Sequence, residues 1–518
     1  MTHDAAVDVV VIGAGHNGLV AAAQLAKAGF STLVVEQRPT VGGAASNALA
    51  HSMPPVHPAL ARAMGLNGLD WVRPDIAMTA VNAAGKAIPF YADHKKTIDA
   101  LSVTSPKDAA RYGAFVAQLT AASGVVGAVL GKRAPDMDSP SLSDLLSLGG
   151  AARKFRALDR RTAYGLLRWG PMPIADFVDE WFDDELMKAA VAARGVFGAM
   201  LGPRSAGSTL SYLYQLAFDA HPVGSGLTLT GGISAFSDAL AKAANAAGAM
   251  IRVSSAVRQI ILNGADAVAG VSLASGETID CRAVVSAVGP KRTLLDLVEP
   301  GVIAPDAITR ARNIRARGVT AKINLSLDAL PVFPALAAHP SALRGRVHVG
   351  PSVEYLEKAF DASKYGESSP EPWLEIAVPS THDGSLAPAG KHIMSIYAQY
   401  APRDLRGRAW RDEKPTLLRN AMRALDTVAP GIERIVVNAE VITPEDLELT
   451  YGMDGGHIHH GEHTLDQMLV ARPLLGLTNY GSPVAGLYLA SGGSHPGGGI
   501  TGLPGLLASA EVARGLRK

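Results

Sequence analysis

The sequence predicts an α/β protein made of two interleaved domains, and three observations support this. The chain opens with a strand, a glycine-rich turn, a helix and a second strand within residues 7–43. Two further blocks of similar character lie at 227–288 and 486–515. The segments between them differ, since 72–226 is largely helical in pattern and 300–450 offers extended runs. We therefore expect one α/β unit, assembled from three stretches, that hosts an α+β domain by insertion.

Length and composition bound the class of protein. The 518 residues allow about two to four domains at roughly 100 to 200 residues each. The 48 Lys and Arg residues nearly balance the 47 Asp and Glu residues, which argues against a nucleic-acid-binding protein and against a polybasic membrane anchor. With Cys281 alone, the chain cannot form an internal disulfide, a thiol redox pair or a cysteine metal site. Any redox chemistry must therefore use a bound cofactor.

The first block, residues 7–43, has a separate residue pattern for each of its expected elements. Residues 7–12 are a continuous apolar, β-branched run, which predicts a strand. The turn 13–18 contains three glycines, and the small residues of 19–28 lead to Gly29, which predicts a closely packed helix and its end. Residues 31–35 predict a second strand that ends at Glu36.

The other two blocks follow the same logic. A helix is expected from 230 to 247, opened by a Gly-Gly turn and stopped by Gly248. Strands are expected at 250–253, 257–262, 267–273, 283–288 and 486–490, and a last helix from about 500 to 515. In the segment 300–450, extended runs are expected at 320–327, 373–378 and 392–400. We therefore assign 1–71, 227–299 and 451–518 to a cofactor domain, and 72–226 and 300–450 to a substrate domain.

The spacing of Gly13, Gly15 and Gly18 between a strand and a helix is typical of a dinucleotide site. The first glycine permits the tight turn, the second lets the backbone approach a pyrophosphate, and the third lets the helix pack closely on the strand. The amides at the helix start then face the phosphates. Glu36 lies 21 positions beyond Gly15, where its carboxylate can accept hydrogen bonds from a ribose diol. These features predict a Rossmann-like domain.

The Gly42-Gly43 pair just after Glu36 favours FAD over NAD as the dinucleotide. The full pattern of glycines, small residues and acid resembles the glutathione-reductase-type FAD superfamily, in the branch that holds amine oxidases and phytoene desaturases. Thr32 stands where that pattern usually has an aliphatic residue, and Thr is also a strand former. The resemblance implies a glutathione-reductase-type FAD-binding domain interleaved with an α+β substrate domain.

Later segments extend the resemblance to the rest of the cofactor domain. The turn 231–233 and the strands up to Val257 resemble the segment that brings a backbone edge to the adenine, and 284–290 resembles the strand and turn that pass near the flavin. Residues 487–505 are similar to the phytoene-desaturase-type ending, whose helix start near Thr501 directs its dipole at the flavin. The residues that the resemblance assigns to FAD are Gly13, Ala14, Gly15, His16, Asn17, Gly18, Glu36, Gln37, Arg38, Gly42, Gly43, Ala44, Val257, Ala287, Gly289, Gly492, Gly493, Ile500 and Thr501.

Within that branch, residues 16–19 and 446–461 look most like the pyridine nucleotide-disulphide oxidoreductase domain-containing protein 2 group. Disulphide chemistry is nevertheless excluded, because the chain has no cysteine pair. Many relatives place an Asp in the C-terminal glycine turn to hold the ribityl hydroxyls, whereas this chain has Gly492, Gly493 and Ser494 there. The group that makes this contact therefore stays open.

The resemblance implies an FAD-dependent oxidoreductase that dehydrogenates a largely apolar small molecule by hydride transfer to flavin N5. No other GxGxxG lies between a strand and a helix, because the run 497–499 is assigned to the first cofactor's site. NAD(P)H is thus not expected to have its own domain, and we expect dioxygen or a quinone to accept the electrons. The alternatives are a flavin amine or amino-acid oxidase, and a flavin-bound interaction protein with little turnover.

A desaturase also needs a base for a second proton, and two histidines are candidates. His495 lies in the turn expected nearest the flavin, and His57 lies within a proline-rich segment. For each, a structural histidine that hydrogen-bonds the backbone is the competing and favoured interpretation.

The cluster His457, His459, His460 and His463 has the density of a metal site. Alternation on a strand would place His457 and His459 on one face. Because the preceding glycines are shared with the flavoprotein group, we favour a pocket-lining or solvated role and expect no metal.

Two segments bear on membranes and location. The charge-free stretch 114–130 is shorter than a bilayer span and predicts a buried helix, with a membrane-surface or substrate-entry helix as the alternative. The basic cluster Arg153, Lys154, Arg156, Arg160 and Arg161 is expected on one helix, as a solvated face or a weak contact with anionic lipid. Residues 1–8 lack a secretory signal, so we expect a cytoplasmic protein. A peripheral contact with a membrane is compatible with this location. The oligomeric state is not predicted.

Overall fold

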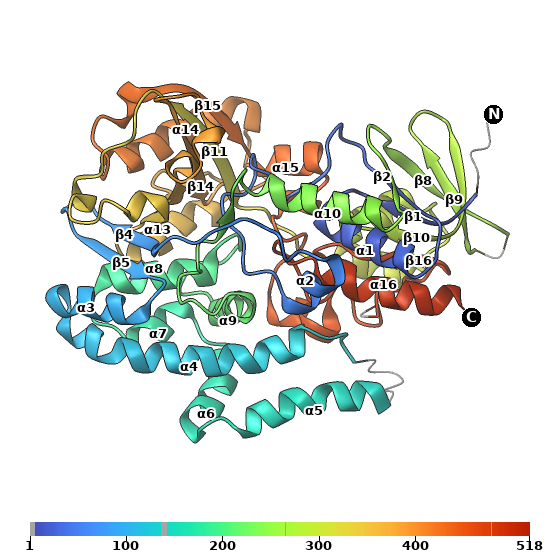
Figure 1. The fold of residues 1–518 in the computed structure, drawn as a ribbon, viewed down its shortest axis with the longest axis horizontal. Helices are drawn as coiled ribbons and strands as arrows, with labels where there is room; N and C mark the ends of the chain where they lie inside the picture. Colours follow the sequence, from blue (N-terminus) through green and yellow to red (C-terminus); the bar gives the residue numbers. More distant parts are fainter. Residues whose placement is uncertain (1–5, 136–141, 265, 478, 518) are drawn as a thin grey trace.

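The computed structural model describes residues 6–135, 142–264, 266–477 and 479–517, and the side chains of 142–148 are not described. Residues 1–5, on which the expectation about a secretory signal partly rests, lie outside this set. Two sheets divide the molecule, one toward each end of the view in Figure 1, with a layer of helices below the second. The first and last described residues of the chain lie beside the first sheet (Figure 1).

The first sheet is seven-stranded and runs β7-β2-β1-β10-β9-β8, with β16 also beside β10. Its strands are β1 Val7–Ile12, β2 Thr32–Val35, β7 Met250–Arg252, β8 Val257–Leu262, β9 Val268–Leu273, β10 Thr278–Ser286 and β16 Leu487–Leu489. Strands β7, β2, β1, β10 and β16 are parallel, with Val10 opposite Leu33 on one side and Val284 on the other. All three of the stretches 1–71, 227–299 and 451–518 therefore contribute strands to one sheet.

Helices α1 His16–Lys27, α10 Ser234–Ala246 and α16 Leu503–Leu516 pack together beside this sheet. Val9 and Val11 face these helices in one core, while Val10 and Ile12 face a second core on the opposite side. Burial on both faces explains why β1 reads as an unbroken apolar run.

Strand β10 begins at Thr278, five residues before the expected start. Its first part, Thr278 to Asp280, pairs antiparallel with β9, and only its later part runs parallel to β1. The alternation of buried and exposed residues from Thr278 to Arg282 is the pattern of a half-buried strand, so the sequence carried the signal that was missed. The last helix begins at Leu503 rather than near 500, because the glycine turn continues to Gly502.

The second sheet is also seven-stranded, in the order β15-β11-β14-β13-β12-β4-β5. Its strands are β4 Ile76–Val81, β5 Ala87–Tyr91, β11 Thr320–Leu327, β12 Arg346–Val349, β13 Trp373–Ala377, β14 His392–Gln399 and β15 Val436–Ile442. Only the β12–β4 pair is parallel. Strands β4 and β5 are a correction, since the sequence pattern of 72–226 had indicated mainly helix. The helices associated with this half are α13 Val353–Lys364, α14 Trp410–Asp426 and α15 Pro444–Tyr451.

The remaining helices of 72–226 form the layer below this sheet (Figure 1). They are α3 His94–Thr104, α4 Pro106–Leu130, α5 Leu142–Arg156, α6 Arg160–Trp169, α7 Ile174–Asp179, α8 Glu185–Val196 and α9 Ser208–Phe218. Short elements elsewhere are α2 Pro58–Met64, β3 Trp71–Val72, β6 Thr228–Leu229, α11 Pro290–Arg292 and α12 Pro305–Arg312.

Helix α4 departs from its expectation in length and burial. It begins at Pro106 and spans 25 residues, and only 33% of its most apolar window is buried. By length and composition it is the single described helix that could cross a membrane, which is weak evidence, because core helices of soluble proteins pass the same test. The helix expected to be buried is therefore only partly buried.

The basic cluster lies on two helices, which corrects the expectation of one. Arg153, Lys154 and Arg156 end α5, and Arg160 and Arg161 begin α6. The break occurs at residues 157–159, where the Asp159 carboxylate accepts a hydrogen bond from the Thr162 amide and caps α6.

Candidate active site

A cavity of about 250 Å³ is lined by residues of both halves of the molecule. At one end it is bounded by the β1–α1 turn and the end of β2, and in its middle by the glycine turn before α16. Its other end is formed by α8, α9 and strands β11 to β14.

The three fingerprint glycines each have a distinct physical reason. Gly13 has a φ of +97°, which a residue with a side chain rarely adopts. A Cβ atom on Gly18 would lie 2.0 Å from the Gly13 carbonyl oxygen, so helix and turn pack too closely for a side chain. Nothing lies within 4 Å of the Cβ position of Gly15, which lines the cavity and leaves the backbone open to a ligand.

The start of α1 offers free hydrogen-bonding groups to the cavity. Among the described residues no side chain caps this helix, whose first residues His16 and Asn17 line the cavity. The buried Asn17 Oδ1 atom has no hydrogen-bond partner among the described residues. An anion at the free amides and a hydroxyl donor at Asn17 would satisfy them, as a dinucleotide does.

The carboxylate of Glu36 is buried and lines the cavity at the end of β2. Its Oε2 accepts from the Ala14 amide at 2.8 Å, and its Oε1 accepts from the Arg38 amide at 2.9 Å. The Arg38 guanidinium lies 4.2 Å from the ring centroid of Tyr451, which also lines the cavity. Gln37 is not among the lining residues, and its side-chain amide donates to the Thr450 carbonyl oxygen.

The C-terminal glycine turn borders the middle of the cavity through Gly492, Ile500 and Thr501. The His16 ring contacts the Gly499 carbonyl oxygen at 3.2 Å, and burial lowers the pKa of His16 to about 4. Gly493 lies behind this wall, where its Cβ position is 2.2 Å from Pro290 Cδ, so the turn packs directly on that proline.

Arg472 holds the glycine turn and the histidine loop 457–463 together. Its fully buried guanidinium donates to the carbonyl oxygens of Glu462, Gln467, His459, Gly461 and Gly492, at 2.7 to 3.3 Å. No carboxylate accepts from it among the described residues, and burial lowers its pKa to about 10. Sequence reasoning missed this residue.

Ala287 lines the cavity, whereas Gly289 lies one step behind it. A Cβ on Gly289 would lie 2.1 Å from the carboxyl carbon of Asp454. That carboxylate accepts from the Lys291 amide at 3.0 Å, and burial raises the pKa of Asp454 to about 6. Gly289 thus makes room for an acid that fixes the loop preceding the histidines.

The remaining assigned residues support the cavity or lie apart from it. Gly43 and Ala44 line it, while Ala14, Gly18 and Gly42 stand directly behind the lining. Val257 begins β8 opposite Leu273 and is not among the lining residues.

Three histidines of the cluster, His459, His460 and His463, line the cavity. They lie on turns rather than on a strand, which corrects the expected alternation. The His459 and His463 rings stack with centroids 4.7 Å apart, and burial lowers the pKa of both. Within the described part of the chain, no group of three or more His, Cys, Asp or Glu residues could hold a metal ion.

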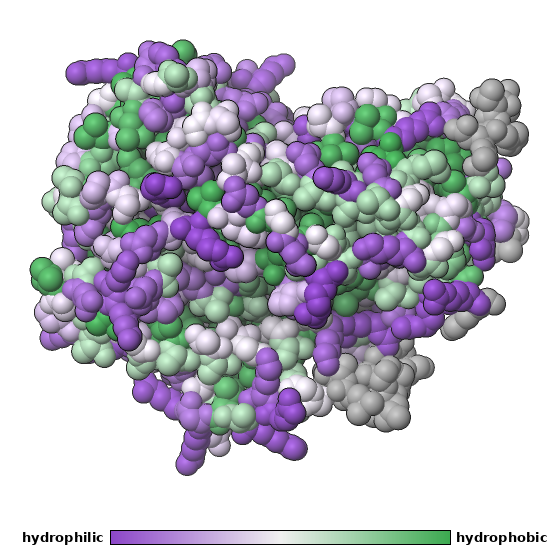
Figure 2. All heavy atoms as spheres, viewed as in Figure 1, coloured by the Kyte–Doolittle hydropathy of each residue, from purple (hydrophilic) through white to green (hydrophobic). Residues whose placement is uncertain are grey.

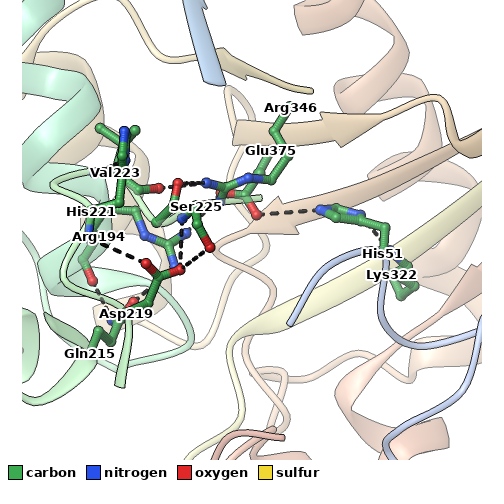
Figure 3. Close-up of polar contacts among 11 residues, drawn as sticks. His51, Arg194, Gln215, Asp219, His221, Val223, Ser225, Lys322, Arg346 and Glu375 are labelled. Atoms are coloured by element: carbon green, nitrogen blue, oxygen red, sulfur yellow. Dashed lines mark hydrogen bonds and ion pairs between the residues drawn. The ribbon is translucent and has the colours of Figure 1, made fainter. Parts of the chain in front are cut away.

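A buried ionic chain closes the other end of the cavity (Figure 3). Lys322 Nζ lies 3.1 Å from His51 Nδ1, and His51 Nε2 lies 3.3 Å from Glu375 Oε1. Lys322 Nζ also donates to the Ser395 hydroxyl and lies 4.0 Å from the Tyr397 ring centroid. Burial lowers the pKa of Lys322 to about 7 and that of His51 to about 3, so this histidine is neutral.

Two guanidiniums share the second oxygen of Glu375. Arg194 Nη1 and Arg346 Nη1 donate to Glu375 Oε2 at 2.8 and 2.9 Å. These two cations hold the pKa of Glu375 well below its usual range, against the opposing effect of burial. Arg194, Lys322, Arg346 and Glu375 all line the cavity.

Neither histidine proposed as a base belongs to the described lining of the cavity. His57 caps α2, where its Nδ1 accepts from the Ala59 amide at 3.2 Å. His495 is buried, and its Nε2 lies 2.7 Å from the Lys132 carbonyl oxygen. Both contacts are with the backbone, as expected of a structural histidine rather than a catalytic base.

Sequence reasoning missed the ionic chain although it had located the strands that carry it. Lys322 is a buried charged residue within β11, and Glu375 interrupts the otherwise apolar run of β13. A charged residue inside a buried strand was the available signal, because such a residue must find a partner or a ligand.

This fold and this cavity define a flavin-dependent oxidoreductase with FAD as its cofactor. Residues 18–379 match the family model described as flavin containing amine oxidoreductase. The chain belongs to that family.

Comparisons with individual proteins agree with this assignment. The chain is 32% identical to pyridine nucleotide-disulfide oxidoreductase domain-containing protein 2 of Rattus norvegicus, over 98% of this chain and 94% of that protein. It is 26% identical to a zeta-carotene-forming phytoene desaturase of Myxococcus xanthus, over 97% of this chain and 92% of that protein. The crystal structure of an oxidoreductase from Methanosarcina mazei shares the fold, with a TM-score of 0.62 at 17% identity, covering 98% of this chain and 100% of the other.

The word disulfide in the rat protein's name does not describe chemistry that this chain can perform. Cys281 is the only cysteine and is buried in β10. Burial raises the pKa of its thiol to about 12, which suppresses the reactive thiolate.

Proposed function

We propose that the protein dehydrogenates a carbon–carbon bond of a largely apolar substrate and passes the electrons to dioxygen or a quinone-type acceptor. The carrying observation is that one cavity joins the dinucleotide fingerprint to a chamber with apolar and aromatic walls. These walls include Met53, Phe197, Leu216, Phe218 and Ile458. A substrate in this chamber is positioned and screened from water, which are the main tasks of a flavoprotein in hydride transfer.

The chain's own residues divide the remaining work. Bound FAD supplies the two-electron acceptor at its flavin ring. The amides at the start of α1, Glu36 and Asn17 would hold the dinucleotide. Lys322 accepts the second proton, because it lines the cavity and its pKa of about 7 leaves a neutral amine available near neutral pH. This role replaces those proposed for His57 and His495, which hydrogen-bond the backbone instead.

The test is an anaerobic titration of the FAD-loaded protein with candidate substrates. A substrate should bleach the oxidised flavin band, and readmitted air or an added quinone should restore it. Hydrogen peroxide after readmission of air identifies dioxygen as the acceptor. Absence of bleaching with any apolar alkene precursor would contradict the proposal and favour a flavin-bound interaction protein.

An amine oxidase is the second candidate, and one feature of the chamber favours it. Phe197 and Tyr397 form an edge-to-face pair in the cavity wall, with centroids 5.2 Å apart, and such rings can flank an amine. The same titration decides between the two, because primary amines would then bleach the flavin where uncharged hydrocarbons do not.

A further inference from the structure

We propose that the substrate carries a carboxylate, which binds the Arg194 guanidinium at the end of the cavity opposite the dinucleotide fingerprint. The substrate class is therefore an apolar carboxylic acid rather than a hydrocarbon or an amine. The inference relies on the proposed function only in treating this end of the cavity as the substrate chamber.

Charge balance at this end of the cavity is the first argument. Glu375 is the only described carboxylate that contacts Arg194 and Arg346, and it serves both with a single oxygen atom. The nearby carboxylate of Asp219 accepts from the Ser225 amide and hydroxyl, at 2.6 and 2.7 Å. By direct contact, two guanidiniums thus share a single carboxylate. A buried guanidinium whose N–H groups are not all matched by acceptors is costly, and an anionic ligand at Arg194 would offset that cost.

The accessibility of Arg194 is the second argument. Its side chain is 16% exposed, whereas those of Arg346 and Glu375 are each 4% exposed, so Arg194 is the most accessible of the three side chains. Two of its N–H groups donate, to Glu375 and to the Gln215 side chain at 2.8 and 2.9 Å. A guanidinium has five N–H donors, and a carboxylate can accept from two of them in one plane.

The surroundings indicate what the rest of such a ligand is like. The Arg194 guanidinium lies 5.0 Å from the ring centroid of Phe197, which also lines the cavity. Tyr397 continues this aromatic wall toward Lys322. A ligand with an apolar body along these rings and an anionic end at Arg194 fits both features, whereas an ammonium at the same place would be repelled.

The experiment uses the FAD-loaded protein with oxidised flavin, under anaerobic conditions, and three probes of equal length, octanoate, 1-octanol and octylamine. Binding is followed by calorimetry and by perturbation of the flavin absorption band. Octanoate should bind at least about tenfold more tightly than octanol, with octylamine weakest, since a charge-assisted contact contributes on the order of 1.5–3 kcal/mol. Equal or tighter binding of octanol or octylamine would overturn the proposal.

Variants locate the binding to Arg194. Arg194→Met should lose the preference for octanoate while its affinity for octanol stays within about twofold. Arg204→Met, an exposed arginine paired with Glu354, should bind all three probes as the parent does. Unchanged octanoate binding by Arg194→Met would show that the anion site is elsewhere or absent.

A second variant keeps the test decisive if Arg194→Met does not fold. Glu375→Gln removes the competing carboxylate and should tighten octanoate binding several-fold, whereas a purely structural ion cluster predicts no gain. Binding is measured as an affinity and turnover as bleaching of the flavin band, so failure here leaves the anaerobic titration unaffected, and failure of that titration leaves the binding result standing.

Discussion

Lys322 is a buried amine whose environment makes stability depend on pH. Its pKa is about 7 in the folded protein and near 10.5 in the unfolded chain. Between these values the unfolded chain binds the extra proton, so the free energy of unfolding rises with pH, by at most about 1.4 kcal/mol per pH unit. This contribution is complete above the unfolded pKa and is lost as the pH falls to about 7.

The variant Lys322→Met removes this titration. Relative to the parent, it should be most stable near pH 7 and should lose that advantage as the pH rises toward 10. Urea unfolding of the FAD-loaded proteins across this window measures the difference. Lys358→Met, at an exposed position, is the control and should track the parent. Parallel curves for Lys322→Met and the parent would disprove the lowered pKa.

Arg472 predicts a link between the glycine turn and cofactor retention. Arg472→Met would leave five buried carbonyl oxygens without their donor, at a cost of roughly 1–3 kcal/mol for each group that stays unsatisfied. The FAD content per chain and the unfolding temperature should both fall, and Arg472→Lys should recover part of each. If Arg472→Met keeps full FAD content, Arg472 does not support the cofactor wall.

At the scale of elements, helices α5 and α6 form an outlying surface below α4 (Figure 1). Figure 2 shows hydrophilic side chains along this lower edge. Tyr164 and Leu167 of α6 are exposed among the arginines, at 62% and 67%. Basic residues beside exposed apolar ones are typical of a helix that lies on a membrane surface.

We therefore predict that the protein binds vesicles containing phosphatidylserine. Replacing Arg153, Lys154, Arg156, Arg160 and Arg161 together with Gln should reduce sedimentation with these vesicles at least tenfold, since each basic residue contributes about 1 kcal/mol near an anionic surface. The matched control removes five exposed cations elsewhere, Lys358, Lys391, Arg406, Arg411 and Arg419, and should leave sedimentation unchanged. A parent protein that never sediments would end the idea.

At the scale of the whole molecule, local sequence pattern predicted the first sheet well and the second sheet in part. Strand β1 and the glycine turn follow from short-range rules, because one chain segment both forms and reports them. Strands β4 and β5 were missed although they form a local hairpin, and β4 also pairs with β12, more than 250 residues away in sequence.

Contacts between residues far apart in sequence also explain why only part of the candidate site was predicted. The residues near the dinucleotide fingerprint follow from local spacing, whereas the ionic chain joins a loop, a helix and three strands. His51 contacts Lys322 at a separation of 271 residues, and no pattern in either neighbourhood indicates that contact. Long-range packing thus decides which group can take a proton, and this is why the two histidines chosen as candidate bases, His57 and His495, do not line the cavity.

The number of dinucleotide sites in the whole molecule predicts whether NADPH can reduce the flavin. Its first sheet holds a parallel βαβ unit with the glycine fingerprint, and the second sheet is antiparallel except for the β12–β4 pair. The described residues therefore provide one dinucleotide site of this type, and bound FAD would occupy it. NADPH should reduce the flavin under anaerobic conditions at least 100-fold more slowly than the substrate does. Stopped-flow absorbance measures both rates, and dithionite serves as the control that the flavin is reducible. Reduction by NADPH as fast as turnover would require a second nucleotide site and would refute the one-cofactor arrangement.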